Sequence, residues 1–206
     1  MKRKVLGLLS FVFCLVSFVL GLRLLWADPL TLSTFDKRTN ALGGASSVYQ
    51  QAPSHIGVTL TTTVSHDAGG KSLKLDYDKK GSGGPYGKGG WCGFYTKLKQ
   101  LDKYFDASGY TKLTFWVKGA KGDENFRVGM SDRHWDELDD TVKSEDIGTY
   151  LPSGKITTDW QQAAVPLEVF SIDLSEIASV TFSFETECFS GGAGFGTVYI
   201  DDLALE

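Results

Sequence analysis

From about residue 55 to the C-terminus, apolar and polar side chains alternate, as in β-strands that bury one face. In the clearest run, Leu113, Phe115 and Val117 share one face while Trp116 and Lys118 share the other. Similar runs occupy residues 58–64, 73–77, 94–98, 126–131, 180–185 and 198–205. Glycine-rich and polar turns separate them, and no amphipathic helix of useful length follows the first 27 residues. The pattern predicts an all-β protein of roughly nine or ten strands, arranged as an antiparallel two-sheet jelly-roll β-sandwich.

Composition agrees with this fold class and excludes one class of partner. The chain has 24 glycines and only 5 prolines, which suits many strands joined by tight turns. Its hydrophobic content of 42% is enough to fill a core, and its length of 206 residues fits a single domain after the leader. The formal charge of −4 lacks the basic footprint of a nucleic-acid binder, and we expect no nucleic-acid partner.

The N-terminus has the pattern of an export signal. Lysine and arginine occupy residues 2–4, residues 5–22 are uncharged, and Ala27 offers a cleavage site. We therefore predict a hydrophobic leader helix, residues 1–27, that is removed to leave an exported domain at residues 28–206. The alternative is a retained membrane anchor through residues 5–22, which are just long enough to span a bilayer. In either case the domain would be periplasmic, secreted or on the cell surface.

Two cysteines fall in the predicted exported part, Cys92 and Cys188. An oxidising compartment favours a disulfide between them. Two separate buried thiols are the alternative.

Carboxylates near both ends of the exported chain suggest a cation site. Asp201 and Asp202 are adjacent in the last strand, while Asp36 and Asn40 precede the glycine pair that begins at Gly43. Calcium binds such mixtures of carboxylate and carbonyl oxygens. We therefore predict a structural Ca²⁺ between the two ends. The alternative is that Asp36 and Asn40 form turn hydrogen bonds while the two C-terminal aspartates face water.

Several aromatic side chains lie on the polar faces of predicted strands. The aromatic face attracts the weakly positive C–H groups of a sugar ring, and neighbouring polar side chains can bind its hydroxyls. The candidate ligand-binding residues on these strands and the acidic loop at 132–146 are Trp91, Tyr95, Trp116, Arg127, Asp132, Trp135 and Tyr150. Packing of each ring against a loop or sheet edge is the alternative for every one of them.

An enzyme is a third possibility. Glu185 and Glu187 lie two residues apart in a predicted strand, so their carboxyl groups would share a face, as the paired acids of a glycosidase must. Alternating acidic residues are also common on solvated strands. Because the chain is short for a deep cleft, we predict no enzyme activity, with a small jelly-roll glycosidase as the alternative.

An ordered set of short motifs resembles a known group of domains. The set resembles the galactose-binding-like β-sandwiches, especially carbohydrate-binding modules of family eleven, and the related domain of complex I intermediate-associated proteins. In chain order the motifs are Phe35-Asp36, Asn40-Ala41-Leu42-Gly43-Gly44, Lys71-Ser72-Leu73-Lys74-Leu75-Asp76-Tyr77, Leu113-Thr114-Phe115-Trp116-Val117-Lys118-Gly119, Trp160, Val165-Pro166-Leu167 and Tyr199-Ile200-Asp201-Asp202. This resemblance implies a non-catalytic jelly roll with a structural calcium ion and a glucan groove on its concave sheet.

Residues and resemblance together predict an exported module that binds a polysaccharide or oligosaccharide, with a β-glucan as the expected polymer. Such a module would hold the polymer near a partner enzyme or a cell-surface protein. The alternative is a protein-interaction, assembly or adhesion module of the same fold.

Overall fold

The structure is a computed structural model that describes residues 27–101 and 103–206. Residues 1–26 of the predicted leader, and with them the alternative membrane anchor at residues 5–22, lie outside the described residues. Within the part of the chain that is described, no helix has the length and apolar character needed to cross a membrane.

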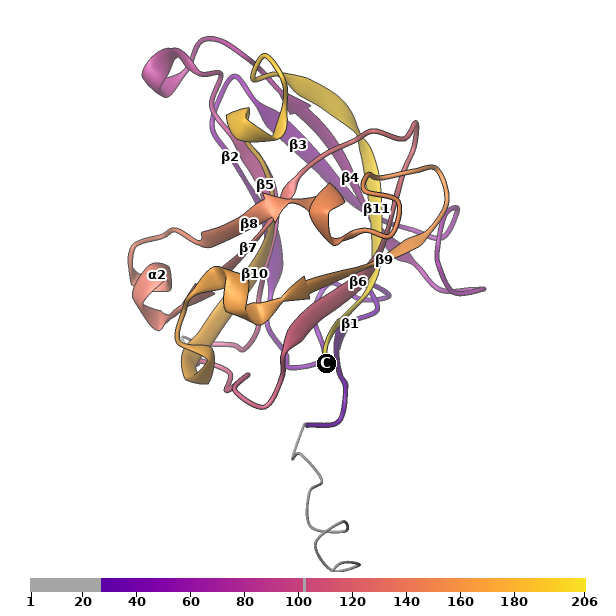
Figure 1. Ribbon diagram of the computed structural model, residues 1–206, viewed down its shortest axis with the longest axis vertical. Helices are drawn as coiled ribbons and strands as arrows, with labels where there is room; N and C mark the ends of the chain where they lie inside the picture. The colour runs from indigo at the N-terminus through magenta and orange to yellow at the C-terminus, as the bar shows by residue number, and fades with distance from the viewer. Residues whose placement is uncertain (1–26, 102) are drawn as a thin grey trace, which may run out of the picture.

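Eleven strands within these residues form two antiparallel sheets packed face to face (Figure 1). The six-stranded sheet has the order β3 (His55–Thr61), β4 (Ser72–Lys79), β11 (Gly194–Leu205), β6 (Lys112–Gly119) and β9 (Gln161–Pro166), with β1 (Leu30–Ser33) paired to β11. The five-stranded sheet has the order β2 (Ser46–Gln50), β5 (Cys92–Lys97), β10 (Ile177–Phe184), β7 (Arg127–Asp132) and β8 (Val142–Asp146). The predicted all-β, two-sheet antiparallel sandwich is confirmed.

Short helical turns occupy the connections between strands. The helix α2 (Arg133–Glu137) follows β7, within the segment that the sequence predicts as a long acidic loop. The 3₁₀ turns are η1 (Pro85–Gly87), η2 (Ile147–Tyr150), η3 (Leu167–Phe170), η4 (Leu174–Glu176) and η5 (Thr186–Cys188).

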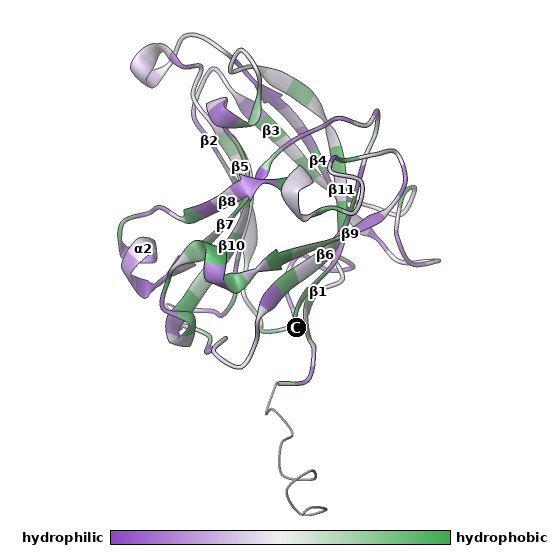
Figure 2. Ribbon diagram, viewed as in Figure 1, coloured by the Kyte–Doolittle hydropathy of each residue, from purple (hydrophilic) through white to green (hydrophobic). Residues whose placement is uncertain are grey.

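Aromatic rings fill the space between the sheets. Phe182 on β10 lies 5.2 Å from Phe115 on β6 and 5.6 Å from Phe126, measured between ring centroids, and both contacts are edge-to-face. Figure 2 shows the apolar positions as green bands along the strands. All eight residues of β10 are buried, because the core covers one face of this central strand and other side chains cover the other.

The two cysteines correct one prediction. Both Cys92 and Cys188 are free and buried, so the predicted disulfide is absent from the structure. The Cys188 thiol donates to the Ser183 carbonyl over 3.6 Å. Burial raises the pKa of Cys92 to about 12 and that of Cys188 to about 11, which keeps both as protonated thiols.

Truncation of the central ring should test the core. We expect Phe182→Ala to lower the free energy of unfolding by about 3–5 kcal/mol, because it leaves a cavity between the sheets. Urea denaturation measures this change. The control is Phe195→Ala on β11, whose side chain is 73% exposed, and its effect should stay within about 0.5 kcal/mol. Equal effects of the two substitutions would contradict this account of the core.

Candidate functional site

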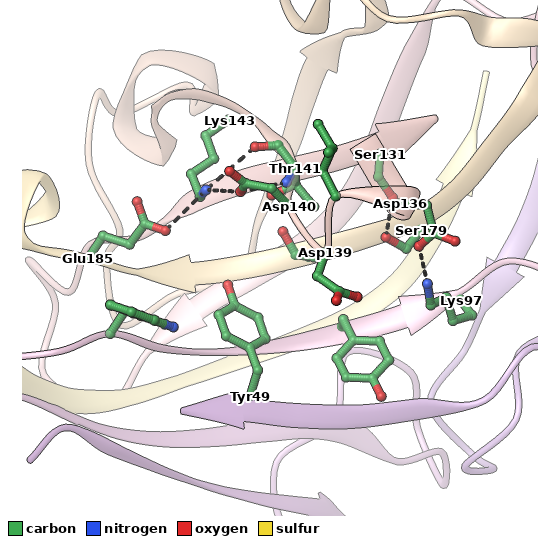
Figure 3. Close-up of a pocket in the computed structure, with 14 residues that line it drawn as sticks. Tyr49, Lys97, Ser131, Asp136, Asp139, Asp140, Thr141, Lys143, Ser179 and Glu185 are labelled. Carbon is green, nitrogen blue, oxygen red and sulfur yellow. Dashed lines mark hydrogen bonds and ion pairs between the residues drawn. The ribbon is translucent and has the colours of Figure 1, made fainter. Parts of the chain in front are cut away.

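A groove of about 590 Å³ lies on the outer face of the five-stranded sheet. Strands β2, β5, β7, β8 and β10 contribute to it, and α2 with the segment that follows forms one wall. Figure 3 shows Tyr49 extending from its strand into this space, between Glu185 on one side and Asp139 and Lys97 on the other. The lining residues are Tyr49, Trp91, Tyr95, Lys97, Ser131, Asp136, Leu138, Asp139, Asp140, Thr141, Lys143, Ser179, Thr181 and Glu185.

The floor of the groove consists of small residues. The outward residues of β10 are Ser179, Thr181 and Ser183, and each is at most 5% exposed. Their neighbours across the sheet include Gly93, paired with Ser183, and Gly129, paired with Thr181. A Cβ atom on Gly93 would lie 2.4 Å from the Tyr49 ring. The missing side chain therefore allows Tyr49 to lie close over β5.

Hydrogen bonds within the floor hold its side chains in place. The Tyr49 hydroxyl and Ser183 Oγ are 2.6 Å apart, and Ser131 Oγ and Ser179 Oγ are also 2.6 Å apart. Burial raises the pKa of Tyr49, so its hydroxyl stays neutral and can both donate and accept. The floor thus presents fixed hydroxyl groups beside an aromatic ring.

Three aromatic side chains, from β2, from β5 and from the residue just before β5, line the groove. Trp91, just before β5, is 38% exposed. Tyr95 lies on the same face of the sheet, where it pairs with Ser47 of β2 and Thr181 of β10. Trp91 and Tyr95 were predicted from the sequence, whereas Tyr49 was missed. The alternation of Ser47, Val48 and Tyr49 could have indicated its strand.

Charged side chains form the walls. Lys97 pairs with Asp136 of α2, and Lys143 Nζ lies 3.3 Å from carboxylate oxygens of both Glu185 and Asp140. Burial raises the pKa of Glu185, and the charge of Lys143 opposes this shift. With Asp139 included, four carboxyl groups face two ammonium groups, so the lining is acidic. The sequence had indicated only a solvated acidic loop for Asp136, Asp139 and Asp140.

The sequence matches a family of carbohydrate-binding domains. The model of the family Carbohydrate binding domain 30 matches residues 35–206, which is most of the chain. The chain belongs to this family. A comparison with the curated proteins finds no match.

Solved structures of family 30 and family 11 modules share the fold of this family 30 domain. The family 30 module of the cellulosomal cellulase Cel9D-Cel44B of Clostridium thermocellum has a TM-score of 0.62 and 21% identity, over 87% of this chain and 98% of that chain. The family 11 module of the cellulosomal cellulase Lic26A-Cel5E of the same organism has a TM-score of 0.55 and 13% identity, over 87% and 94%. A family 11 module of this organism in complex with a β-1,3-1,4-mixed-linked tetrasaccharide gives 0.55 and 12%, over 86% and 94%. The resemblance to family eleven predicted from the sequence is confirmed.

Trp116 and Arg127 do not line the groove of the family 30 domain, so the structure does not bring these two predicted residues together with Trp91 and Tyr95. Trp116 lies on β6 in the other sheet, where its ring stacks on His66 with 4.0 Å between centroids. Alternation places a side chain on the polar face of its strand, but it does not say which sheet contains the strand. Arg127 lies on β7, and its Nε donates to Asp146 over 2.9 Å.

Three further candidates serve the local structure instead. Asp132 caps α2 by accepting a hydrogen bond from the Trp135 backbone N–H at 3.0 Å, and its other oxygen accepts from Asp173 N–H at 2.8 Å. The Trp135 ring contacts His134, and Tyr150 packs against the core. None of Asp132, Trp135 and Tyr150 lines the groove, so the structure does not bring these predicted residues to it.

The proposed glycosidase pair does not share a strand face. Strand β10 ends at Phe184, and Glu187 lies within the 3₁₀ turn η5. Glu185 lines the groove and pairs with Lys143, whereas Glu187 is exposed. The strand geometry that suggested paired acids is therefore absent at these two residues.

The predicted calcium ligands only partly fit a cation site. Asn40 Oδ1 accepts from the N–H groups of Leu42 and Gly44, and Asn40 Nδ2 donates to the Lys97 carbonyl at 2.6 Å. Asn40 is thus committed to the turn, which is the alternative that the sequence left open for this residue. The backbone carbonyl near Gly43 stays a predicted ligand.

The three aspartates of the set surround one segment, residues 66–71. His66 N–H donates to Asp201, His66 Nδ1 lies 2.9 Å from Asp202, and Lys71 N–H donates to Asp36. Burial raises the pKa of Asp201 to about 6, with repulsion from Asp202 as a further cause. Of the three aspartates, Asp202 belongs to a group of possible cation ligands, with His66 and Asp67, whose ligand atoms lie within 4.8 Å of one another. A Ca²⁺ ion at this end of the sandwich stays a prediction.

A glycine substitution tests the floor of the groove. We expect Gly93→Ala to lower the free energy of unfolding by about 1–3 kcal/mol, because the added methyl overlaps the Tyr49 ring. Chemical denaturation measures this change. Gly57→Ala on β3 is the matched control, because a Cβ there meets its nearest atom at an ordinary 3.8 Å. A Gly93→Ala variant as stable as the control would contradict the close approach of Tyr49.

Thermal unfolding with calcium and then with a chelator tests the cation site. We expect calcium to raise the melting temperature, about 2–4 °C for each 1 kcal/mol of binding, and Asp202→Asn to abolish this shift. Asn40→Ala should lower the melting temperature equally with and without calcium. A wild-type domain that does not respond to calcium would refute the site.

Proposed function

We propose that this family 30 domain binds a neutral β-glucan chain along the groove and does not cleave it. The observation that carries the proposal is that Tyr49, Trp91 and Tyr95 line one groove beside a floor of hydrogen-bonded hydroxyl groups. Carbohydrate binding follows from the family. The choice of polymer and of this groove is the proposal.

The domain would recognise the glucan by aromatic stacking on its sugar rings and by hydrogen bonds to its hydroxyl groups. The exposed part of Trp91 and the half-buried Tyr95 offer ring faces to the C–H groups of successive sugars. The carboxylates of Asp139 and Glu185 can accept hydrogen bonds from sugar hydroxyls. The negative charge of the carboxylates strengthens these hydrogen bonds. Because the floor side chains already hold one another, little ordering is required when a glucan binds.

The charge of the walls supports a neutral polymer. Four carboxyl groups and two ammonium groups line the groove, so an anionic chain such as polygalacturonate would meet net repulsion. A neutral glucan meets no such repulsion and offers hydroxyl donors to the carboxylates.

Family membership supports binding without cleavage. The arrangement of Glu185 and Glu187 supports it too, because the two residues do not lie on one strand face as a pair of catalytic acids. The predicted leader supports export of the domain, which would then hold the polymer near a partner enzyme or the cell surface. These roles extend the proposal beyond the carbohydrate binding that the family shows.

Substitution of the groove aromatics tests the proposal. We expect Trp91→Ala and Tyr95→Ala each to weaken binding to mixed-linked β-1,3-1,4-glucan by about tenfold or more, because each removes a stacking surface. Affinity electrophoresis in gels that contain this glucan measures the change.

Trp116→Ala is the matched control, because it removes an aromatic ring from the opposite sheet and should leave the glucan affinity unchanged. Polygalacturonate should not retard the wild-type domain, and no reducing sugar should be released from the glucan. A folded wild-type domain that binds no β-glucan would refute the proposal and favour a different glycan or a protein-interaction role. Equal losses in all three variants would refute the groove.

A further inference from the structure

A second aromatic surface adjoins the groove at the glycine-rich loop, residues 81–90. A hollow of about 220 Å³ lies there, lined by residues that include Tyr86, Lys88, Glu187, Trp91 and Glu185. The last two, Trp91 and Glu185, also line the groove itself. The hollow therefore continues the groove beyond Trp91.

The Tyr86 side chain is 89% exposed at this place. Its backbone has φ 60° and ψ 9°, the left-handed conformation that a bulky residue adopts only at a cost of about 1–2 kcal/mol. A largely exposed ring recovers little of this cost through packing. Strained backbone of this kind is concentrated at functional sites, and here its effect is to display an aromatic ring.

A buried lysine fixes the base of the loop. Lys79 is 1% exposed, and its ammonium group donates to the carbonyl oxygens of Lys80, Lys88 and Gly192 at 2.5, 2.8 and 3.1 Å. Ser54 Oγ donates to the Gly89 carbonyl. These bonds tie the loop to β4 and to the turn before β11, although the tip of the loop has few contacts of its own.

Close backbone packing adds to this constraint. A Cβ atom on Gly89 would lie 1.7 Å from the Lys80 carbonyl oxygen, and one on Gly90 would lie 2.1 Å from that of Gln51. Both glycines also have positive φ angles of 83° and 73°. The glycines therefore allow this loop to pack closely in one defined shape. Its low-complexity composition alone would suggest a flexible linker.

We propose that Tyr86 is a sugar-stacking residue that extends the groove by a further binding position for the same glucan chain. This inference rests on the proposed function. A chain that stacks on Trp91 continues into the hollow, where the Tyr86 ring offers a face and Glu187 and the Lys88 ammonium group offer polar partners. Tyr86 then contributes only to ligands long enough to occupy both the groove and the hollow.

Ligand length separates this role from a structural one. The probes are a β-1,3-1,4-mixed-linked tetrasaccharide and the polymeric mixed-linked glucan, each titrated calorimetrically into the wild-type domain, Tyr86→Ala and Tyr86→Phe. We expect Tyr86→Ala to weaken binding of the polymer by about tenfold and that of the tetrasaccharide by less than about twofold. Tyr86→Phe keeps the ring and should retain wild-type affinity for both probes.

The controls keep the outcome interpretable. Phe195→Ala removes another exposed aromatic ring, on β11 in the other sheet, and should change neither affinity. Unchanged polymer affinity in Tyr86→Ala, or an equal loss for both probes, would overturn the inference. If Trp91→Ala still loses binding in that case, the proposed groove stands and only the extension fails. A wild-type domain that binds neither probe would refute the proposed function itself.

Discussion

Strand β10 must be buried on both faces, and the rest of the architecture depends on this constraint. Its inward residues, such as Phe182, are large and apolar and hold the two sheets together. Its outward residues are small hydroxyl side chains that bond to Tyr49, to Ser131 and to one another. A buried hydroxyl without a partner would destabilise the strand, so the same bonds that form the groove floor also allow the core strand to exist.

Alternation along the chain predicted the fold class and the polar face of each strand, because both depend on neighbouring residues. The same reasoning grouped Trp116 with Tyr95, although the two rings lie on opposite sheets. Sheet membership depends on which distant strands pair, and a single strand carries no such information. Tyr49 was missed for a related reason, since its position depends on the space left by Gly93, which lies far from it in the sequence.

Polar side chains that the sequence offers as ligands also form hydrogen bonds with the protein's own backbone. Asn40 was chosen for its carbonyl oxygen, but N–H groups of the adjoining turn use that oxygen. Asp132 was likewise taken for a sugar ligand and instead caps α2. Short polar side chains near turns satisfy local N–H groups readily, and this competition decides their roles before any external ligand binds. Asp36 and Asp201 also accept hydrogen bonds from backbone N–H groups, whereas the faces of aromatic rings on open strands take part in no such bonds.

The floor of small residues has a consequence for how such domains diversify. Its depth is set by glycine, serine and threonine positions that the core strand and Tyr49 already constrain, so few substitutions can alter it without loss of stability. In contrast, one wall of the groove comes from the segment around α2, and the hollow beyond Trp91 is lined by the glycine-rich loop. Both segments lie outside the two sheets. Exchange of these two segments could redirect the sandwich to a sugar chain of another linkage or shape, while the sheets beneath remain unchanged.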